Sequence, residues 1–369
     1  MYHGALLRTC VLVVALLAAS GCGSKKPPAF FSNPLPLLTW LGEFTRPAGT
    51  VYPQLNDSSR YGSLSGLAPD QRRKQWIGVI DDREHTRVVW LTIDFGPKGL
   101  EVLPVKMLEL RPGVGTESRR VTEADLESIV ALPNGSFVMG EEGHVRDGSV
   151  WQPALLQMTD GVVTHVIEFP KEFQITGDGK TGLRDNQGFE GLAVTPSGRL
   201  IAGLEQPLFQ DGAVTFDRGA LGWLIEFEPR GGTFRPARKW RYAISPTPRV
   251  ENFDEICSAG ENGLVELLAF SDTILLSMER ACLVTKDKQF TANTVQLFSV
   301  ELIAGDARKR LLLNFDTITP RLSSALSRLE NFEAMTFGPI VNGTPTLLIG
   351  SDDNFRSTQK TSFLLFGMR

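Results

Sequence analysis

The sequence predicts an all-β fold, a β-propeller of five four-stranded blades, from three observations. A pattern of acid, apolar run, turn, apolar run and second acid recurs, starting at residues 65, 127, 190, 266 and 333. Internal repeats on this scale indicate a repeated supersecondary unit. Two more apolar runs follow each copy except the last, which is followed by one. The N-terminal region holds an apolar run that can complete the last copy.

The clearest copy is residues 186–205, which read NQGFEGLAVTPSGRLIAGLE. Phe189–Val194 is an apolar run, and Thr195–Gly198 has the Pro and Gly of a tight turn before the second run. Two short strands around such a turn form a β-hairpin, whose outer ends lie together. We therefore expect Glu190 and Glu205 on the same edge of the protein.

The other copies place acids at the same two points of the pattern. First-position acids are Glu127, Glu190, Glu266 and Glu333, and the first copy has Ser65 there. Second-position acids are Asp81, Glu142, Glu205, Glu279 and Asp352. In a propeller the first strand of each blade lines the central channel, so these acids are predicted to gather around its mouth.

The closure of the ring follows from the two ends of the chain. After Asp352 only one apolar run remains, Ser362–Phe366, whereas Pro36–Phe44 is an unused run near the N-terminus. A last blade completed by the N-terminal strand leaves no free sheet edge. Six blades are the alternative, because residues 250–265 are long enough to contain weak strands.

Residues 1–21 have the pattern of an export signal, with Arg8 before an apolar core and small residues before Cys22. The run LAASGC resembles a bacterial lipobox, which predicts a lipid anchor on Cys22; a soluble secreted protein is the alternative. By resemblance to other lipoproteins, Gly23 after the cysteine favours the outer membrane, facing the periplasm. Residues 22–34 are then a tether, and residues 35–369 are the propeller.

The balance of charge and the cysteines indicate which partners and which redox compartment the chain suits. Lys and Arg number 38 against 42 Asp and Glu, and no basic stripe indicates a nucleic-acid partner. Cys257 and Cys282 lie near the outer ends of one hairpin, and an oxidising compartment favours a disulfide between them. A pair of free buried cysteines is the alternative. We expect a monomer.

Clustered carboxylates cannot all ionise without compensation, and calcium accepts six to eight oxygen ligands. Shared protons, arginines or hard cations can provide this compensation. Calcium is the candidate cofactor among the cations, with both sets of acids as its candidate ligands. Arginines beside the second acids form simple ion pairs with them or are candidate phosphate ligands, namely Arg83, Arg280 and Arg356. The candidate catalytic residues are Glu190, Glu205, Arg280 and His144. The alternative is that the repeated acids are architectural and accept backbone N–H groups from neighbouring blades.

The phrases GFEGLAVTPSGRLIAGLEQPL and NFEAMTF…LLIGSDDNF…TSFLLF resemble the phytase-like family, described as having esterase-like activity of phytase. The resemblance covers about residues 65–369. It implies a propeller with phosphoesterase activity, by analogy with calcium-dependent propeller phytases. This chain departs from the pattern at Ser65, and at Ala334 where the corresponding motif has Gly191.

Two functions from different classes follow. The first is an exported, metal-dependent phosphoesterase acting on small organic phosphate esters. The second is a non-catalytic, lipid-anchored propeller that binds a protein or glycan of the cell envelope. No G-x-S-x-G elbow is present, which argues against a serine hydrolase of that type.

Overall fold

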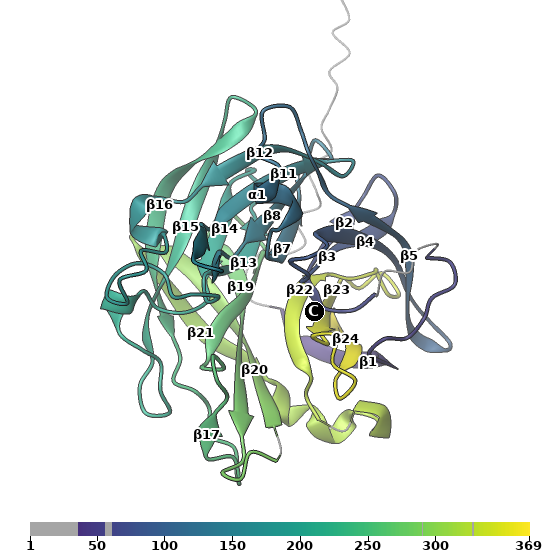
Figure 1. The fold of residues 1–369 in the computed structure, drawn as a ribbon. Coiled ribbons are helices and arrows are strands. Elements are labelled where there is room, and N and C mark those ends of the chain that lie inside the picture. Colours follow the sequence, from purple (N-terminus) through teal and green to yellow (C-terminus); the bar gives the residue numbers. More distant parts are fainter. Residues whose placement is uncertain (1–35, 56–60, 290, 327) are drawn as a thin grey trace, which may run out of the picture.

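The computed structural model describes residues 36–55, 61–289, 291–326 and 328–369. The predicted signal sequence, the lipidation site Cys22 and the tether lie outside the described residues. Nearly all regular structure is β-strand (Figure 1). In the part of the chain that is described, no helix combines the length and the apolar character that crossing a bilayer requires.

Antiparallel units of four strands follow one another along the chain. The first unit is β2 (Leu64–Asp70), β3 (Gln75–Ile80), β4 (Arg87–Gly96) and β5 (Gly99–Glu109). The second is β7 (Leu126–Ala131), β8 (Phe137–Glu141), β11 (Ala154–Thr159) and β12 (Val162–Glu168). The third is β13 (Phe189–Val194), β14 (Leu200–Leu204), β15 (Ala220–Arg230) and β16 (Thr233–Ile244).

The fourth unit is β18 (Gly263–Ala269), β19 (Ile274–Val284), β20 (Thr291–Ile303) and β21 (Asp306–Asn314). The fifth is β22 (Asn331–Phe337), β23 (Thr346–Asp352), β24 (Lys360–Met368) and β1 (Leu38–Pro47). Minor strands are β6 (Arg111–Pro112), β9 (His144–Arg146), β10 (Ser149–Trp151) and β17 (Glu255–Ile256). Helical turns are α1 (Arg119–Thr122), η1 (Lys171–Phe173), η2 (Phe209–Asp211), η3 (Phe315–Thr317), η4 (Thr319–Arg321) and η5 (Ser324–Leu326).

The first strands of the units form a closed ring. β2 contacts β7, β7 contacts β13, β13 contacts β18, β18 contacts β22, and β22 contacts β2. The last unit is completed by the N-terminal strand, since β1 pairs antiparallel with β24 from Leu38↔Met368 to Pro47↔Lys360. Figure 1 shows purple β1 beside yellow β24. The prediction of an all-β propeller closed by its N-terminal strand is confirmed.

The division of the ring into separate blades is less clear than the ring itself. β16 and β21, the outer strands of the third and fourth units, pair in parallel at Arg241↔Asp306 and Tyr242↔Ala307. This contact merges the two units into one nine-stranded sheet. Five blades therefore stay a prediction.

Neighbouring units pack through apolar side chains of their facing sheets. Between the second and third units, the ring centroids of Phe169 and Phe189 lie 3.9 Å apart with nearly parallel planes. Near the centre the inner strands approach so closely that a Cβ added at Gly191 would lie 3.0 Å from Leu267 Cγ. This close approach explains why a glycine stands at Gly191 and brings the starts of the inner strands together.

The predicted disulfide between Cys257 and Cys282 is present, with their Cα atoms 5.4 Å apart. It joins the segment after β17 to β19. The Cys257 N–H donates to the Cys282 carbonyl at 2.9 Å, and the Cys282 N–H donates to the Gly260 carbonyl at 2.9 Å. The disulfide and these two hydrogen bonds thereby attach the loop before β18 to β19.

Candidate metal centre at the mouth of the ring

A β-bulge near the start of each inner strand positions the first set of site residues. In β13 the pairing passes from Phe189↔Leu204 to Gly191↔Gly203, which leaves Glu190 without a partner on β14. A bulged residue leaves the regular alternation and can be aimed away from the sheet. The residues at the equivalent bulges are Ser65, Glu127, Val265 and Glu333.

The second set follows the second strand of each unit. The Glu205 N–H donates to the Gly188 carbonyl at 2.7 Å, just before the bulge. The Glu142 N–H makes the same bond to the Asp125 carbonyl at 3.1 Å. Residues at the corresponding position in the other units are Asp81 opposite Ser63, Arg280 opposite Gly263, and Asp352 opposite Asn331.

This register corrects the prediction for the fourth unit. Leu264 pairs with Glu279, and the bulge falls on Val265. Glu266 and Glu279 are therefore each displaced by one residue from the positions that Glu190 and Glu205 hold. The prediction that both belong to the same rim of acids is wrong, because side chains one residue apart on a strand point to opposite faces.

Glu266 has an architectural role instead. Its side chain is buried and accepts the N–H of Leu192, in the third unit, at 3.1 Å and that of Leu267 at 2.9 Å. It also accepts the N–H of Met335 in the fifth unit. One carboxyl group thus joins three inner strands, which is the alternative interpretation that the sequence left open for the repeated acids.

Glu279 is also satisfied away from the other acids. It accepts from the Tyr242 hydroxyl at 2.7 Å, from the Asn262 side-chain amide at 2.8 Å and from the Ser245 N–H at 3.2 Å. It also pairs with the ammonium group of Lys309. These partners account for both of its oxygens.

The remaining acids converge. Two groups of three each place ligand oxygens within 4.8 Å of one another. They are Asp81, Asp125 and Glu127, and Glu142, Glu190 and Glu205. We call these six residues, together with Glu333 and Asp352, the acidic cluster. Sequence reasoning missed Asp125, which directly precedes β7, because only the hydrogen bond from Glu142 places it at the mouth.

Burial and mutual repulsion change the acidity of this cluster. Burial, followed by the charges of Glu205 and Glu333, raises the pKa of Glu190 well above its usual value. Burial raises the pKa of Glu205 to about 8, although Arg280 opposes the shift. It raises the pKa of Asp352 to about 8 as well. The pKa values of Asp81, Glu127 and Glu142 are raised for the same reasons, burial first and neighbouring carboxylates next.

Two arginines supply positive charge. Arg280 lies 2.5 Å from Glu333, and Arg83 lies 2.5 Å from Asp125 and also contacts Asn186. Arg356 differs: it is exposed, and within the described residues its side chain makes no ion pair with the acidic cluster. The structure therefore brings Arg83 and Arg280 to the predicted site and leaves Arg356 outside it.

Several carboxylate oxygens of the cluster lack protein donors. Among the described residues, Glu142 Oε2 and Glu190 Oε2 are buried and have no hydrogen-bond partner. Buried anionic oxygens without donors are costly unless a cation or a proton compensates them. Hard oxygen ligands grouped in threes fit a divalent cation such as calcium.

His144 lies beside the cluster and not within it. Its ring is buried and stacks on Trp151, with centroids 4.8 Å apart. Burial lowers the pKa of His144. The Arg119 guanidinium carbon lies 4.0 Å from the centroid of the same indole ring. One face of the imidazole is thus covered by an aromatic ring, and among the described residues its buried Nδ1 has no hydrogen-bond partner.

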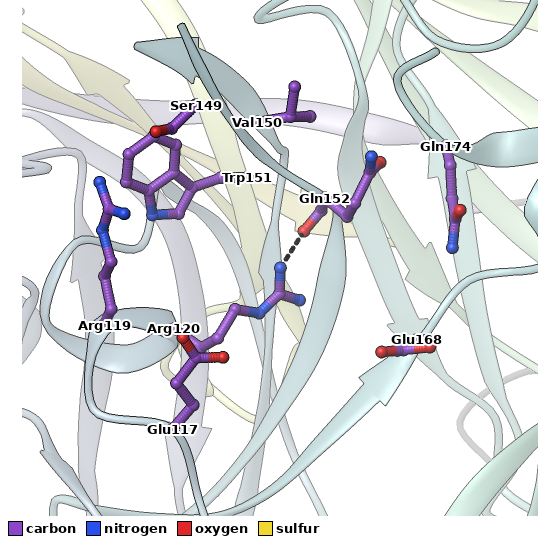
Figure 2. Close-up of a pocket in the computed structure, with 9 residues that line it drawn as sticks. All are labelled: Glu117, Arg119, Arg120, Ser149, Val150, Trp151, Gln152, Glu168 and Gln174. Carbon is purple, nitrogen blue, oxygen red and sulfur yellow. Dashed lines mark hydrogen bonds between the residues drawn. The ribbon is translucent and has the colours of Figure 1, made fainter. Parts of the chain in front are cut away.

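Trp151 borders a cavity of about 300 Å³ next to the second unit (Figure 2). Figure 2 shows the Arg120 guanidinium directed at the Gln152 carbonyl, with Glu168 and Gln174 on the other wall. Arg120 also lies 3.7 Å from Glu141, whose pKa burial raises to about 8. Glu141, which directly precedes Glu142 in the chain, does not line the cavity, but Arg120 does and connects the two.

A family model described as "Phytase-like: Esterase-like activity of phytase" matches residues 59–355. The search of curated proteins finds no match. Among solved structures, the Dos1 propeller is 8% identical, with 84% of this chain and 69% of that chain covered, at a TM-score of 0.35. A gluconolactonase from Xanthomonas campestris is 9% identical, with 91% of this chain and 99% of that chain covered, at a TM-score of 0.35. The catalytic domain of an α-L-arabinofuranosidase from Coprinopsis cinerea is 10% identical, with 89% of this chain and 97% of that chain covered, at a TM-score of 0.41.

Proposed function

Because this chain belongs to the phytase-like family, whose described activity is esterase-like, we propose that it is a metal-dependent hydrolase of organic phosphate esters. The observation that carries the proposal is the acidic cluster, where two groups of three carboxylates offer oxygens within 4.8 Å of one another. The cluster has more carboxyl groups than Arg83 and Arg280 can pair with. It is suited to bind cations, and bound cations attract phosphate.

Calcium is the cation we propose. Asp81, Asp125 and Glu127 would hold one ion, and the group of Glu142, Glu190 and Glu205 would hold another. When bound, such ions polarise a phosphoryl oxygen and increase the acidity of a water molecule. The buried oxygens of Glu142 and Glu190 that lack donors provide the free ligand positions that this assignment requires.

The protein groups have separable roles in this proposal. Glu205, whose pKa burial raises to about 8 without a cation, would serve as an ionised ligand once a cation is bound, because the cation favours the charged carboxylate. Arg83, whose side chain is partly exposed, can also contact a phosphate oxygen. Arg280 keeps Glu333 and the neighbouring carboxylates from repelling one another. We assign no step to His144, whose ring stacks on Trp151.

The experiment is a calcium titration by calorimetry after treatment with a chelator, followed by a screen of phosphate esters that includes phytate. We expect calcium binding, a higher melting temperature and calcium-dependent release of phosphate. Glu190→Gln should abolish turnover and leave the melting temperature of the chelated protein nearly unchanged. Glu301→Gln, an exposed position on β20, is the matched control and should behave as wild type.

Calcium binding without hydrolysis of any ester would reject the enzyme and favour the alternative, a non-catalytic propeller that binds an envelope protein or glycan. Hydrolysis that is insensitive to both the chelator and Glu190→Gln would reject the acidic cluster as the site. Light scattering of the purified protein tests our further proposal that it acts as a monomer.

We also propose that the protein is exported and anchored by a lipid on Cys22 to the outer membrane, facing the periplasm. The support is the lipobox-like run LAASGC after an apolar segment. Cys22→Ser should move the protein from the membrane fraction to the soluble fraction of the cell envelope. An unchanged membrane fraction would reject the anchor.

A further inference from the structure

We propose that Arg280 is a built-in cation that replaces a metal ion in the acidic cluster. The cluster then binds two divalent cations, in the groups of Asp81, Asp125 and Glu127 and of Glu142, Glu190 and Glu205. It binds none beside Glu333 and Asp352. The inference rests on the proposed metal dependence and specifies how many ions bind and which residue limits them.

The position of Arg280 in the repeat is the first argument. It pairs with Gly263 at the start of the inner strand, where the other units place Asp81, Glu142, Glu205 and Asp352. The bulge of the same unit carries Val265 in place of an acid. The fourth unit has therefore lost both of its cluster carboxylates, and it contributes a cation at one of the two positions.

The contacts of Arg280 are the second argument. Its guanidinium is 2.5 Å from Glu333 Oε1, and the amide of Asn331 donates to the same oxygen at 2.9 Å. The charges of Glu333, Glu190 and Glu205 raise the pKa of Arg280, so its positive charge is permanent. A buried guanidinium surrounded by three carboxylates does the electrostatic work of a bound cation.

The remaining carboxylate of this sector is satisfied by protein donors. Asp352 accepts the N–H of Asn354 at 2.6 Å and the hydroxyl of Ser63. Within the described part of the chain, neither Asp352 nor Glu333 belongs to a group of three acids whose oxygens converge. Glu190, by contrast, retains a buried oxygen without a partner among the described residues. The need for an external cation therefore lies with the first three units.

The test measures calcium stoichiometry by calorimetry on the full-length protein in detergent after treatment with a chelator. We expect two ions per wild-type chain. Arg280→Glu restores the acid that the repeat has elsewhere, and we expect this variant to bind a third ion. Arg356→Glu makes the same change of charge on an exposed arginine outside the cluster, and it should bind two.

Each outcome decides the inference. Two ions in both the wild type and Arg280→Glu would overturn the role of Arg280 while the metal proposal stands. No calcium binding by the wild type would overturn both. If Arg280→Glu does not fold, Arg280→Gln replaces it: calcium should raise its melting temperature by more than it raises that of the wild type. An equal or smaller rise would overturn the inference.

Discussion

Arg280 and Glu333 come from different units of the propeller, yet their side chains lie 2.5 Å apart at the mouth of the inner-strand ring. Their side chains are only 11% and 9% exposed. A pair this buried is costly to desolvate, and it persists because each charge compensates the other. The same arginine is the point where the repeated pattern of acids is interrupted, so one residue serves both the packing and the charge of the site.

Arg280→Met should therefore lower the free energy of unfolding of the chelated protein at pH 8 by about 3–5 kcal/mol, the range for removing one partner of a buried pair. Chemical denaturation measures the change. The double variant Arg280→Met with Glu333→Met should recover part of the loss, since the carboxyl group in direct contact with Arg280 is removed as well. Arg356→Met is the control and should change stability by less than about 0.5 kcal/mol. A loss no larger than that of the control would contradict a compensating role.

The stability of the chelated protein should fall as the pH rises from about 4 to about 8. Glu205 and Asp352 have folded pKa values raised to about 8, above the value of about 4 of an unfolded carboxyl group. Each protonated group therefore stabilises the folded state fully below its unfolded pKa, and this contribution is lost between about pH 4 and pH 8. Melting curves from pH 5 to pH 9 in chelator should show the highest melting temperature at the acid end.

Calcium should flatten this dependence, because a bound cation favours the ionised carboxylates. Matched melting curves at saturating calcium provide the comparison. A chelated protein whose melting temperature is constant or rises between pH 5 and pH 8 would show that these carboxylates are ionised in the folded state without a metal.

The architecture was predictable because its signals are local and repeated. Alternating apolar runs, turns such as Thr195–Gly198 and the spare run at Pro36–Phe44 predict the hairpins and the closure, and the pairing of β1 with β24 confirms the closure. The disulfide was predictable from the positions of Cys257 and Cys282 at the ends of one hairpin. The number of blades was harder to predict from the sequence, because the β16–β21 contact joins strands that are distant in sequence.

The site was predictable only in part, because it depends on register. Glu266 and Glu279 fit the repeated pattern by spacing, but a bulge at Val265 shifts each of them by one position and places Arg280 at the mouth. The repeated sequence pattern does not predict at which residue a β-bulge falls. Asp125 was missed for a related reason: it is recognised as part of the cluster only once the strands are paired.

Glu266 and Glu190 should respond in opposite ways to removal of the carboxyl group. Glu266→Ala leaves three backbone N–H groups in the buried interior without an acceptor, at a total cost of about 3 kcal/mol or more. Glu190→Ala removes a group that its neighbours repel, so the chelated protein should lose little stability. Chemical denaturation of both variants in chelator makes the comparison. Equal losses would contradict the division between an architectural acid and a site acid.

The disulfide should stabilise the strand that carries Arg280. Cys282 is two residues beyond Arg280 on β19, and its bond to Cys257 closes a segment of 25 residues. In the chain-entropy model, closure on this scale contributes about 3 kcal/mol. Reduction of the folded protein should therefore lower the free energy of unfolding by about that amount.

A variant with both Cys257→Ala and Cys282→Ala separates this effect from other actions of the reductant. It should show the lower stability without treatment and no further change on reduction. The calcium stoichiometry of this variant should stay at two, because neither cysteine contributes to the acidic cluster. A reductant that shifts the variant and the wild type equally would place the effect outside this disulfide.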